Sequence, residues 1–251
     1  MTEARIVSPK EWTAARKALL QQEKTLTRQR DRLNQARQAL PWVKLEKSYV
    51  FEGADGPVGL GDLFEQRSQL IVQHFMLGPG WKDGCVGCSF LADHIDGALV
   101  HLAHHDVSFV AVARAPYPEI AAFKERMGWK FRWVSSYGSD FNYDFNVSFT
   151  PEQLAKGKVT YNYETIDASI EEMSGASVFY RDEAGAIFHT YSSYGRGGEE
   201  MLGTYMLLDI TPKGRNETGP TGNLTDWVRH HDRYDEAGRV DATGRYIATG
   251  M

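Results

Sequence analysis

The centre of the chain, residues 69–92, has the sequence QLIVQHFMLGPGWKDGCVGCSFLA. Its first nine residues are almost continuously apolar, which is typical of a strand covered on both faces of a sheet. A glycine-rich loop follows, and then come Cys85 and Cys88. Apolar residues between Phe90 and Leu102 have helical spacing, so the sequence places the two cysteines at the start of a helix.

The segments that follow continue this alternation of strands and helices. Residues 107–113 form a second apolar run, and residues 118–128 are expected to form a helix. Two runs at 176–180 and 186–191 are joined by a short polar turn, which predicts a hairpin, and residues 198–208 predict a closing helix. This order predicts an α/β fold of the thioredoxin-like type, with a central mixed sheet flanked by helices.

The first forty residues differ from the rest in charge and in periodicity. They hold nine basic and four acidic residues. Apolar side chains recur in them at every seventh position, at Trp12, Leu19, Leu26, Leu33 and Leu40. A serine N-cap, a proline and a capping-box glutamate open the predicted helix. Because the apolar row is narrow, we expect a basic helix lying along an acidic surface of its own chain or of a partner subunit.

We therefore expect three parts in the chain. An N-terminal helical extension occupies residues 1–41, and a thioredoxin-like domain occupies residues 42–210, with an insertion at about 136–174. Residues 211–251 form a C-terminal arm rich in glycine, proline, asparagine and charge. Alternating apolar residues at 43–51 predict the first strand of the domain. A further reading is that the helix and the arm exchange between the subunits of a homodimer.

Composition excludes several classes of protein. The 251 residues carry a net charge of −5, which argues against a strongly basic nucleic-acid binder. No apolar run approaches the roughly 18–20 residues that span a bilayer, so we expect no membrane association. The first residues are charged, unlike a signal peptide, and a cytoplasmic location is the expectation.

The two cysteines are the most informative residues of the composition. They are the only cysteines in the chain, and two residues separate them, so they do not form a disulfide framework. A helix N-terminus lowers the pKa of a thiol there, which makes Cys85 the expected nucleophile and Cys88 the thiol that resolves a mixed disulfide. We expect the Cys85 sulfur to be exposed at this helix end. Lys82 adds positive charge nearby. A metal site and an inert pair are the alternatives.

Several stretches of the chain match a known pattern. They lie at 74–81 (HFMLGPGW), 84–93 (GCVGCSFLAD), 126–129, 133–136, 139–142, 177–181, 188–192 and 208–215. In these stretches the chain resembles an uncharacterised bacterial family of thioredoxin-like proteins, described as predicted dithiol–disulfide oxidoreductases. The resemblance implies the thioredoxin-like fold and the two cysteine roles, and it supplies no substrate.

The chain also departs from well-studied thioredoxin relatives. Thioredoxins place a cis-proline against the cysteine pair, where this chain has Ser174, Gly175 and Ala176 and no proline. They also bury an aspartate on the strand before the cysteines, where this chain has His74. That histidine is expected either to act as an acid–base group or to be a hydrogen-bonded core residue. Peroxiredoxins carry a threonine three residues before their reactive cysteine, and Lys82 at that position argues against peroxidase activity.

Aromatic and charged side chains form a second set of candidates. Trp81, Trp129 and Trp133 are expected either to line a pocket beside the cysteines or to pack in the core. Arg114 follows the strand at 107–113, at the edge where open α/β sheets bind ligands. It is expected to hold an anionic substrate group or to form a salt bridge.

A zinc site is a weaker hypothesis, because structural zinc needs about four ligands. Three candidate ligands lie near the far end of the predicted helix, at His101, His104 and His105. His94 would reach the pair only if the helix were broken. The run at 230–232 is expected in an arm that contacts a neighbour. We therefore expect no metal and no cofactor.

The sequence thus predicts a dithiol–disulfide oxidoreductase that uses Cys85 and Cys88 on a disulfide-containing substrate or a redox partner protein. The alternative is a non-catalytic binding module on the same fold, holding a small molecule or a protein partner.

Overall fold

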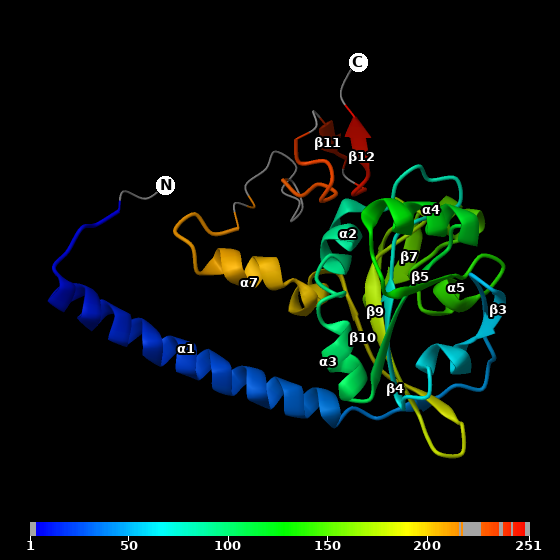
Figure 1. Ribbon diagram of the computed structural model, residues 1–251, viewed down its shortest axis with the longest axis horizontal. Coiled ribbons are helices and arrows are strands. Elements are labelled where there is room, and N and C mark those ends of the chain that lie inside the picture. Colours follow the sequence, from blue (N-terminus) through cyan, green and yellow to red (C-terminus); the bar gives the residue numbers. More distant parts are fainter. Residues whose placement is uncertain (1–3, 216, 218–226, 236–237, 242, 249–251) are drawn as a thin grey trace. The chain divides into compact units, whose positions relative to one another are not determined.

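The computed structural model describes residues 4–215, 217, 227–235, 238–241 and 243–248 (Figure 1). The chain divides into two compact units, Met1–Trp42 and Val43–Met251, and each is described by itself.

The first unit is dominated by one helix, α1 (Pro9–Gln38). Ser8 caps it through a capping box with Glu11, and Pro9 occupies the first turn, as the sequence predicts. A single helix cannot bury its own apolar row, so this row needs a covering surface. The homodimer expected through this helix stays a prediction.

The second unit is built on an eight-stranded mixed sheet with the order β1-β10-β9-β4-β5-β6-β2-β3. β4, β5 and β6 are parallel to one another, and β9 is antiparallel to both β4 and β10. The strands are β1 (Val43–Lys44), β2 (Val50–Gly53), β3 (Gly56–Gly59), β4 (Gln69–His74), β5 (Val107–Ala113), β6 (Arg132–Ser135), β9 (Gly175–Arg181) and β10 (Ile187–Tyr194). This arrangement confirms the thioredoxin-like fold.

Helices cover both faces of the sheet. Side chains of β5 alternate, so that Val110 and Val112 join one core cluster while Phe109, Ala111 and Ala113 join the other. The second cluster is covered by α2 (Val86–Ala92), α3 (Leu99–His104) and α4 (Tyr117–Met127). The first is covered by the 3₁₀ helix η1 (Leu60–Phe64) and by α5 (Phe141–Asp144).

The first predicted strand and the predicted helix that begins at the cysteines are both divided in the structure. The strand expected at 43–51 is divided, because β1 pairs with β10 at one end of the sheet while β2 pairs with β3 and β6 at the other. The helix expected from Phe90 to Leu102 is broken between α2 and α3. At the break, the Asp96 carboxylate accepts hydrogen bonds from the backbone N–H groups of Lys130 and Phe131. This contact binds the segment between the two helices to the start of the segment that leads into β6.

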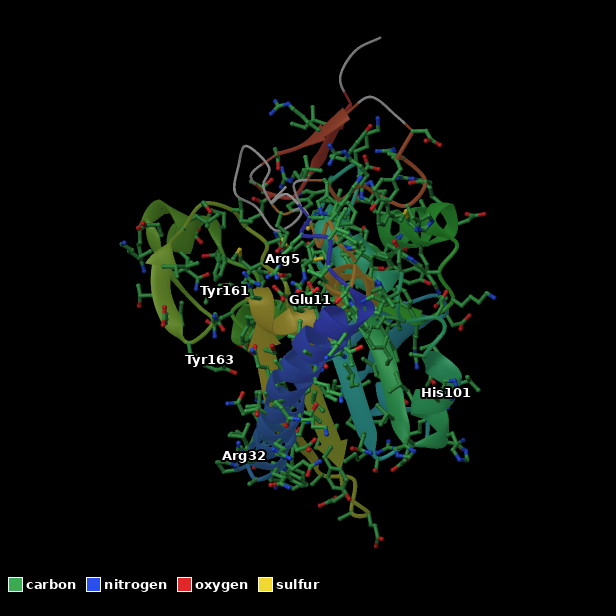
Figure 2. The ribbon with its side chains drawn as sticks, turned by 90° about the vertical axis from the view of Figure 1, so that its left-hand side faces the viewer. Arg5, Glu11, Arg32, His101, Tyr161 and Tyr163 are labelled. Carbon is green, nitrogen blue, oxygen red and sulfur yellow. The ribbon has the colours of Figure 1, made fainter. Side chains whose placement is uncertain are left out.

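The insertion before the hairpin is ordered around a short helix, α6 (Pro151–Ala155), and a two-stranded sheet of β7 (Lys158–Tyr161) and β8 (Glu164–Asp167). Tyr161, in β7, and Tyr163, in the β7–β8 turn, lie beside the main sheet (Figure 2). The Tyr161 hydroxyl donates to the Ser174 carbonyl at 2.8 Å, and the Tyr163 hydroxyl donates to the Ser192 carbonyl at 3.1 Å. These bonds fix the β7–β8 turn beside the start of β9.

The closing helix is divided into the 3₁₀ helix η2 (Gly195–Met201) and α7 (Gly203–Asp209). Beyond it, the described residues of the C-terminal arm fold back onto the domain. Residues 227–235, 238–241 and 243–248, including β11 (Gly238–Val240) and β12 (Tyr246–Ala248), return to the cysteine loop (Figure 1). His230 contacts the Gly84 carbonyl at 2.9 Å, and Arg233 pairs with Asp83 at 3.0 Å.

Among the residues that the structure describes, no helix has the length and the apolar character needed to cross a membrane.

Candidate functional site

The cysteine pair lies at the start of α2, after the loop that follows β4. Cys85 is the N-cap residue of α2, and Cys88 lies in its first turn. The Cys85 backbone N–H donates to the Met76 carbonyl at 3.0 Å, and the Met76 N–H donates to Cys88 Sγ at 3.5 Å. Both thiols are free. The short apolar segment after β4 therefore holds the pair against the carboxyl end of the central strand.

The two thiols differ in acidity. The hydrogen bond from the Cys88 thiol lowers the pKa of Cys85, and the backbone N–H groups of Cys88 and Gly87 lower it further, against burial and the charge of Asp241. The same thiol–thiol bond, together with burial, raises the pKa of Cys88. Cys85 is therefore the first of the two to ionise.

Cys85 is covered, whereas we expected an exposed thiol. Cys85 is 7% exposed and Cys88 is 4% exposed. The cover comes from the C-terminal segment, where the Gly244 carbonyl accepts a hydrogen bond from the Val86 N–H at 2.9 Å. A Cβ added at Gly244 would stand 2.8 Å from Cys85 Sγ, so the backbone of Gly244 lies directly against the sulfur.

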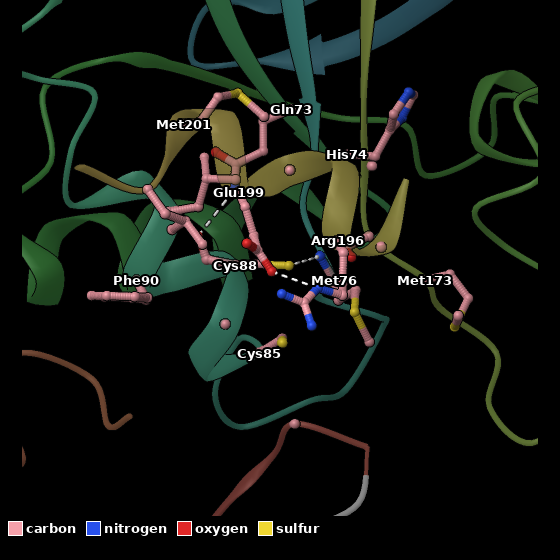
Figure 3. Close-up of a pocket in the computed structure, with 18 of the residues that line it drawn as sticks. Gln73, His74, Met76, Cys85, Cys88, Phe90, Met173, Arg196, Glu199 and Met201 are labelled. Atoms are coloured by element: carbon pink, nitrogen blue, oxygen red, sulfur yellow. Dashed lines mark hydrogen bonds and ion pairs between the residues drawn. The ribbon is translucent and has the colours of Figure 1, made fainter. Parts of the chain in front are cut away.

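A pocket of about 390 Å³ adjoins both cysteines (Figure 3). Its lining is mainly apolar and includes three methionines, Met76, Met173 and Met201. Arg196 and Glu199 lie in the same lining and form an ion pair at 2.8 Å. Ser174 and Gly175, which we expect in the place of the thioredoxin proline, also line the pocket. The described residues contain no cis peptide bond.

Gln73 is a pocket residue that the sequence analysis did not single out. Its side chain is 1% exposed, and its amide nitrogen donates to the Cys88 carbonyl at 3.0 Å. Its carbonyl oxygen has no hydrogen-bond partner among the residues that the structure describes. A buried acceptor left open beside a pocket is a place for a ligand donor. The only sequence signal was a glutamine within a buried strand.

His74 occupies the opposite face of β4, and its ring points away from the cysteines (Figure 3). The ring stacks against Phe141 and Phe145, and Nε2 contacts Ser177 Oγ at 2.7 Å. Burial lowers the pKa of His74 to about 3, and the nearby His189 contributes to this shift. The histidine is therefore neutral near neutral pH and is a hydrogen-bonded core residue, which corrects the acid–base alternative.

This environment predicts a pH effect on stability. Because the pKa of His74 is about 6.5 in an unfolded chain and is lowered in the fold, its contribution to stability is present above about pH 6.5 and is lost as the pH falls toward 3. We expect the His74→Gln variant to show a weaker fall of Tm between pH 6.5 and 4 than the native protein. His101→Gln, at an exposed position of α3 (Figure 2), is the matched control. Equal slopes for native and His74→Gln protein would contradict the assignment.

The tryptophans do not line the pocket. Trp129 and Trp133 are buried in the core cluster that includes Cys85 and Cys88, so of the two roles expected for them the structure supports core packing. The Trp81 ring carries the Arg245 guanidinium 3.5 Å from its centroid, and its Nε1 donates to Glu171 at 2.9 Å. Lys82 is exposed and does not contribute to the shift of the Cys85 pKa.

Arg114 is committed to a buried ion pair. Its guanidinium pairs with Glu172, whose side chain is 1% exposed, and it donates to the Tyr143 hydroxyl at 3.2 Å. Ser148 donates to the other oxygen of Glu172 at 2.6 Å. Of the two roles expected for Arg114, the geometry supports the salt bridge. The pair joins the end of β5 to the end of the insertion.

Two of the histidines considered as metal ligands, His94 and His231, have other partners. His94 contacts the Phe90 carbonyl and Thr204 Oγ1, each at 2.7 Å, and His231 pairs with Asp93 at 2.7 Å. Within the described residues, no group of three or more histidine, cysteine, aspartate and glutamate side chains is placed to hold a metal ion. The run at 230–232 therefore binds its own domain.

Fold and site together define a thioredoxin-like protein with a Cys-x-x-Cys pair at the start of a helix. The chain belongs to the family described as "Bacterial protein of unknown function (DUF899)", whose model matches residues 1–234. A comparison with curated proteins finds no match.

Solved structures similar to this chain are peroxiredoxins. Peroxidoxin BcpB from Mycobacterium tuberculosis is 14% identical, with 66% of this chain and 95% of that chain covered and a TM-score of 0.41. A PrxQ mutant from Xylella fastidiosa is also 14% identical, covering 65% and 89%, with a TM-score of 0.41. The reduced 2-Cys peroxiredoxin from Plasmodium vivax is 13% identical, covering 63% and 83%, with a TM-score of 0.37.

Proposed function

We propose that this protein is a dithiol–disulfide oxidoreductase that uses Cys85 and Cys88. The observation that carries the proposal is the place of the pair: Cys85 is the N-cap residue of α2, and Cys88 lies in the first turn. There, hydrogen bonds from the Cys88 thiol and from backbone N–H groups lower the pKa of Cys85, while the pKa of Cys88 is raised. A thiolate is the nucleophile in thiol–disulfide exchange, so this asymmetry favours Cys85 as the attacking sulfur. We place the chemistry in a reducing cytoplasm, which would keep the pair as a dithiol between turnovers.

The proposed reaction has two exchanges. The Cys85 thiolate attacks one sulfur of a substrate disulfide, forming a mixed disulfide and releasing the other sulfur as a thiolate, which takes up a proton. Cys88 then loses its proton and attacks Cys85 Sγ, releasing the second substrate sulfur. The substrate gains two electrons and two protons, and the protein is left with a Cys85–Cys88 disulfide. An external dithiol restores it.

The first exchange prepares the second. The hydrogen bond to Cys85 and the charge of its thiolate both hold the pKa of Cys88 high. Once Cys85 is part of a mixed disulfide, that negative charge is gone, so the pKa of Cys88 falls. The resolving thiol is thus held protonated until there is an intermediate for it to attack.

A thiolate titration tests the proposal. The ultraviolet absorbance of the Cys85 thiolate should appear with a midpoint below the value of about 8.5 for a free thiol. Replacing Cys88 by alanine should raise this midpoint, because it removes the main hydrogen-bond donor to Cys85. Cys88→Ser keeps an O–H donor and is the matched control, with a smaller shift expected. A native midpoint at or above that of a free thiol would remove the chemical basis of the proposal.

A second candidate is a non-catalytic binding module, favoured by the burial of Cys85 and the adjoining pocket. Reversible oxidation of the pair in glutathione buffers, followed by alkylation and mass measurement, distinguishes the two. The oxidoreductase proposal requires a Cys85–Cys88 disulfide that forms in oxidised glutathione and is reduced again as the proportion of reduced glutathione rises. The binding module requires only that a ligand be retained when both cysteines are serine.

A further inference from the structure

We propose that the substrates of this site are small-molecule disulfides and that the C-terminal segment over Cys85 excludes protein disulfides. The inference rests on the proposed oxidoreductase function and names its substrate class. We call the segment the strap and define it by its described residues, Asp241, Thr243, Gly244 and Arg245.

The strap is a compact turn held by its own side chain. Asp241 Oδ1 accepts hydrogen bonds from the Thr243 N–H at 2.8 Å and from the Arg245 N–H at 3.0 Å. The Asp241 N–H donates to the Arg245 carbonyl at 2.9 Å. Gly244 has a φ of +82°, a conformation that favours glycine. The turn can therefore act as one unit that is either docked or displaced.

Arg245 anchors this turn to the domain. Its guanidinium pairs with Glu171 at 2.7 Å and lies 3.5 Å from the centroid of the Trp81 ring. Trp81 precedes the cysteines in their loop, and Glu171 belongs to the end of the insertion. The strap is thereby tied to both sides of the site, and each contact joins residues more than 70 positions apart in sequence.

The docked strap restricts what can reach Cys85. The Gly244 carbonyl of the strap accepts a hydrogen bond from the Val86 N–H, and the Gly244 backbone lies against Cys85 Sγ. Thiol–disulfide exchange requires the attacking sulfur to meet one sulfur of the substrate directly. A disulfide within a folded protein brings polypeptide on both sides of its sulfurs, and that polypeptide would overlap the strap. Protein disulfides therefore require the strap to leave.

The pocket offers a small disulfide another way to the sulfur. Thr243 and Gly244 form part of its wall, so the pocket lies beside the strap and includes Cys85 in its lining. Its volume of about 390 Å³ falls in the range of small-molecule sites. Methionine side chains adapt to ligands of different shape. The open carbonyl oxygen of Gln73 would accept a bond from a substrate hydroxyl or amide. These features fit a compact disulfide with an apolar body and a hydrogen-bond donor.

A single-turnover experiment on the full chain tests the inference without added reductant. The pre-reduced protein is mixed with 2-hydroxyethyl disulfide or with insulin, and formation of the Cys85–Cys88 disulfide is followed by alkylation and mass measurement. Each rate is divided by the rate of a free thiol with the same disulfide. If the displaced strap is a minor state populated at about 0.1–10%, the normalised rate with insulin should be about 10- to 1000-fold lower than with 2-hydroxyethyl disulfide.

Two strap variants sharpen the test. Gly244→Ala puts a Cβ against the sulfur at a positive φ, and Arg245→Ala removes the anchor to Glu171 and Trp81. Each should raise the normalised insulin rate about tenfold, which corresponds to a loss of about 1.4 kcal/mol in docking. In Arg245→Ala, whose side chain lies outside the pocket lining, the small-disulfide rate should change little. Arg239→Ala, at an exposed position of β11, is the control. Should Gly244→Ala not fold, Arg245→Ala alone decides.

The outcomes separate the two proposals. Oxidation of the native protein by insulin as fast as by 2-hydroxyethyl disulfide, or an unchanged ratio in Arg245→Ala, overturns the inference and leaves the oxidoreductase proposal standing. Oxidation by neither reagent overturns the proposed function itself.

Discussion

Replacing Cys85 by serine is expected to lower disulfide reductase activity by at least about 10³-fold, because the nucleophilic thiolate is lost. Cys88→Ser should lose turnover as well, yet for a different reason. In that variant Cys85 still attacks the substrate, and the mixed disulfide persists because no thiol resolves it. Activity with a small disulfide measures the first effect, and mass spectrometry of intact Cys88→Ser protein from cells measures the second.

The two variants give opposite results on the covalent adduct. Cys88→Ser should carry a mass increment that dithiothreitol removes, and Cys85→Ser should carry none. Thermal unfolding curves of both variants serve as the control for folding. Unchanged activity in Cys85→Ser would end the proposal, and an adduct on Cys88 in that variant would reverse the assigned roles.

Much of this site could be predicted because its signals are local. The apolar run at 69–77 and the helical spacing after Phe90 place Cys85 and Cys88 at a helix start, and the structure puts them there. The divided strand at 43–51 shows the limit of the same method. Alternation of apolar residues indicates a strand, but which strand it pairs with is decided by contacts far away in the sequence.

The roles of Gln73 and His74 could not be told apart from sequence. Because β4 is buried on both faces, its apolar pattern does not reveal which side chains point toward the cysteines. Adjacent residues of a strand face opposite ways, so only one of the two can lie on the side of the pair. In the structure, the Gln73 side chain lies on the side of the cysteines, and His74 packs against Phe141 on the other side.

The strap left no pattern to recognise. It lies in a glycine-rich, charged tail without periodicity, where composition favours an exposed arm. What holds it are contacts between single side chains, such as Arg245 with Glu171 and Trp81, and spacing along the chain does not encode these. These contacts cover Cys85. Because the sequence carries no sign of them, the sequence alone predicts an exposed thiol.

Replacing Arg114 by methionine is expected to lower the free energy of unfolding by about 3–5 kcal/mol near neutral pH, because it leaves the Glu172 carboxylate buried without its partner. Burial already raises the pKa of Glu172, and Arg114 opposes that shift. Without the arginine the pKa rises further. A raised carboxyl pKa gives stability that is present below the unfolded value and lost as the pH rises through the folded value.

The loss in Arg114→Met should therefore be larger at pH 8 than at pH 5, where Glu172 can fold in its protonated form. Denaturant unfolding at the two pH values measures this. The double variant Arg114→Met/Glu172→Gln carries no buried charge and should recover most of the stability while keeping an acceptor for Ser148. If Arg114→Met instead leaves stability unchanged at both pH values and raises KM for an anionic disulfide, Arg114 binds substrate and the ion pair is incidental.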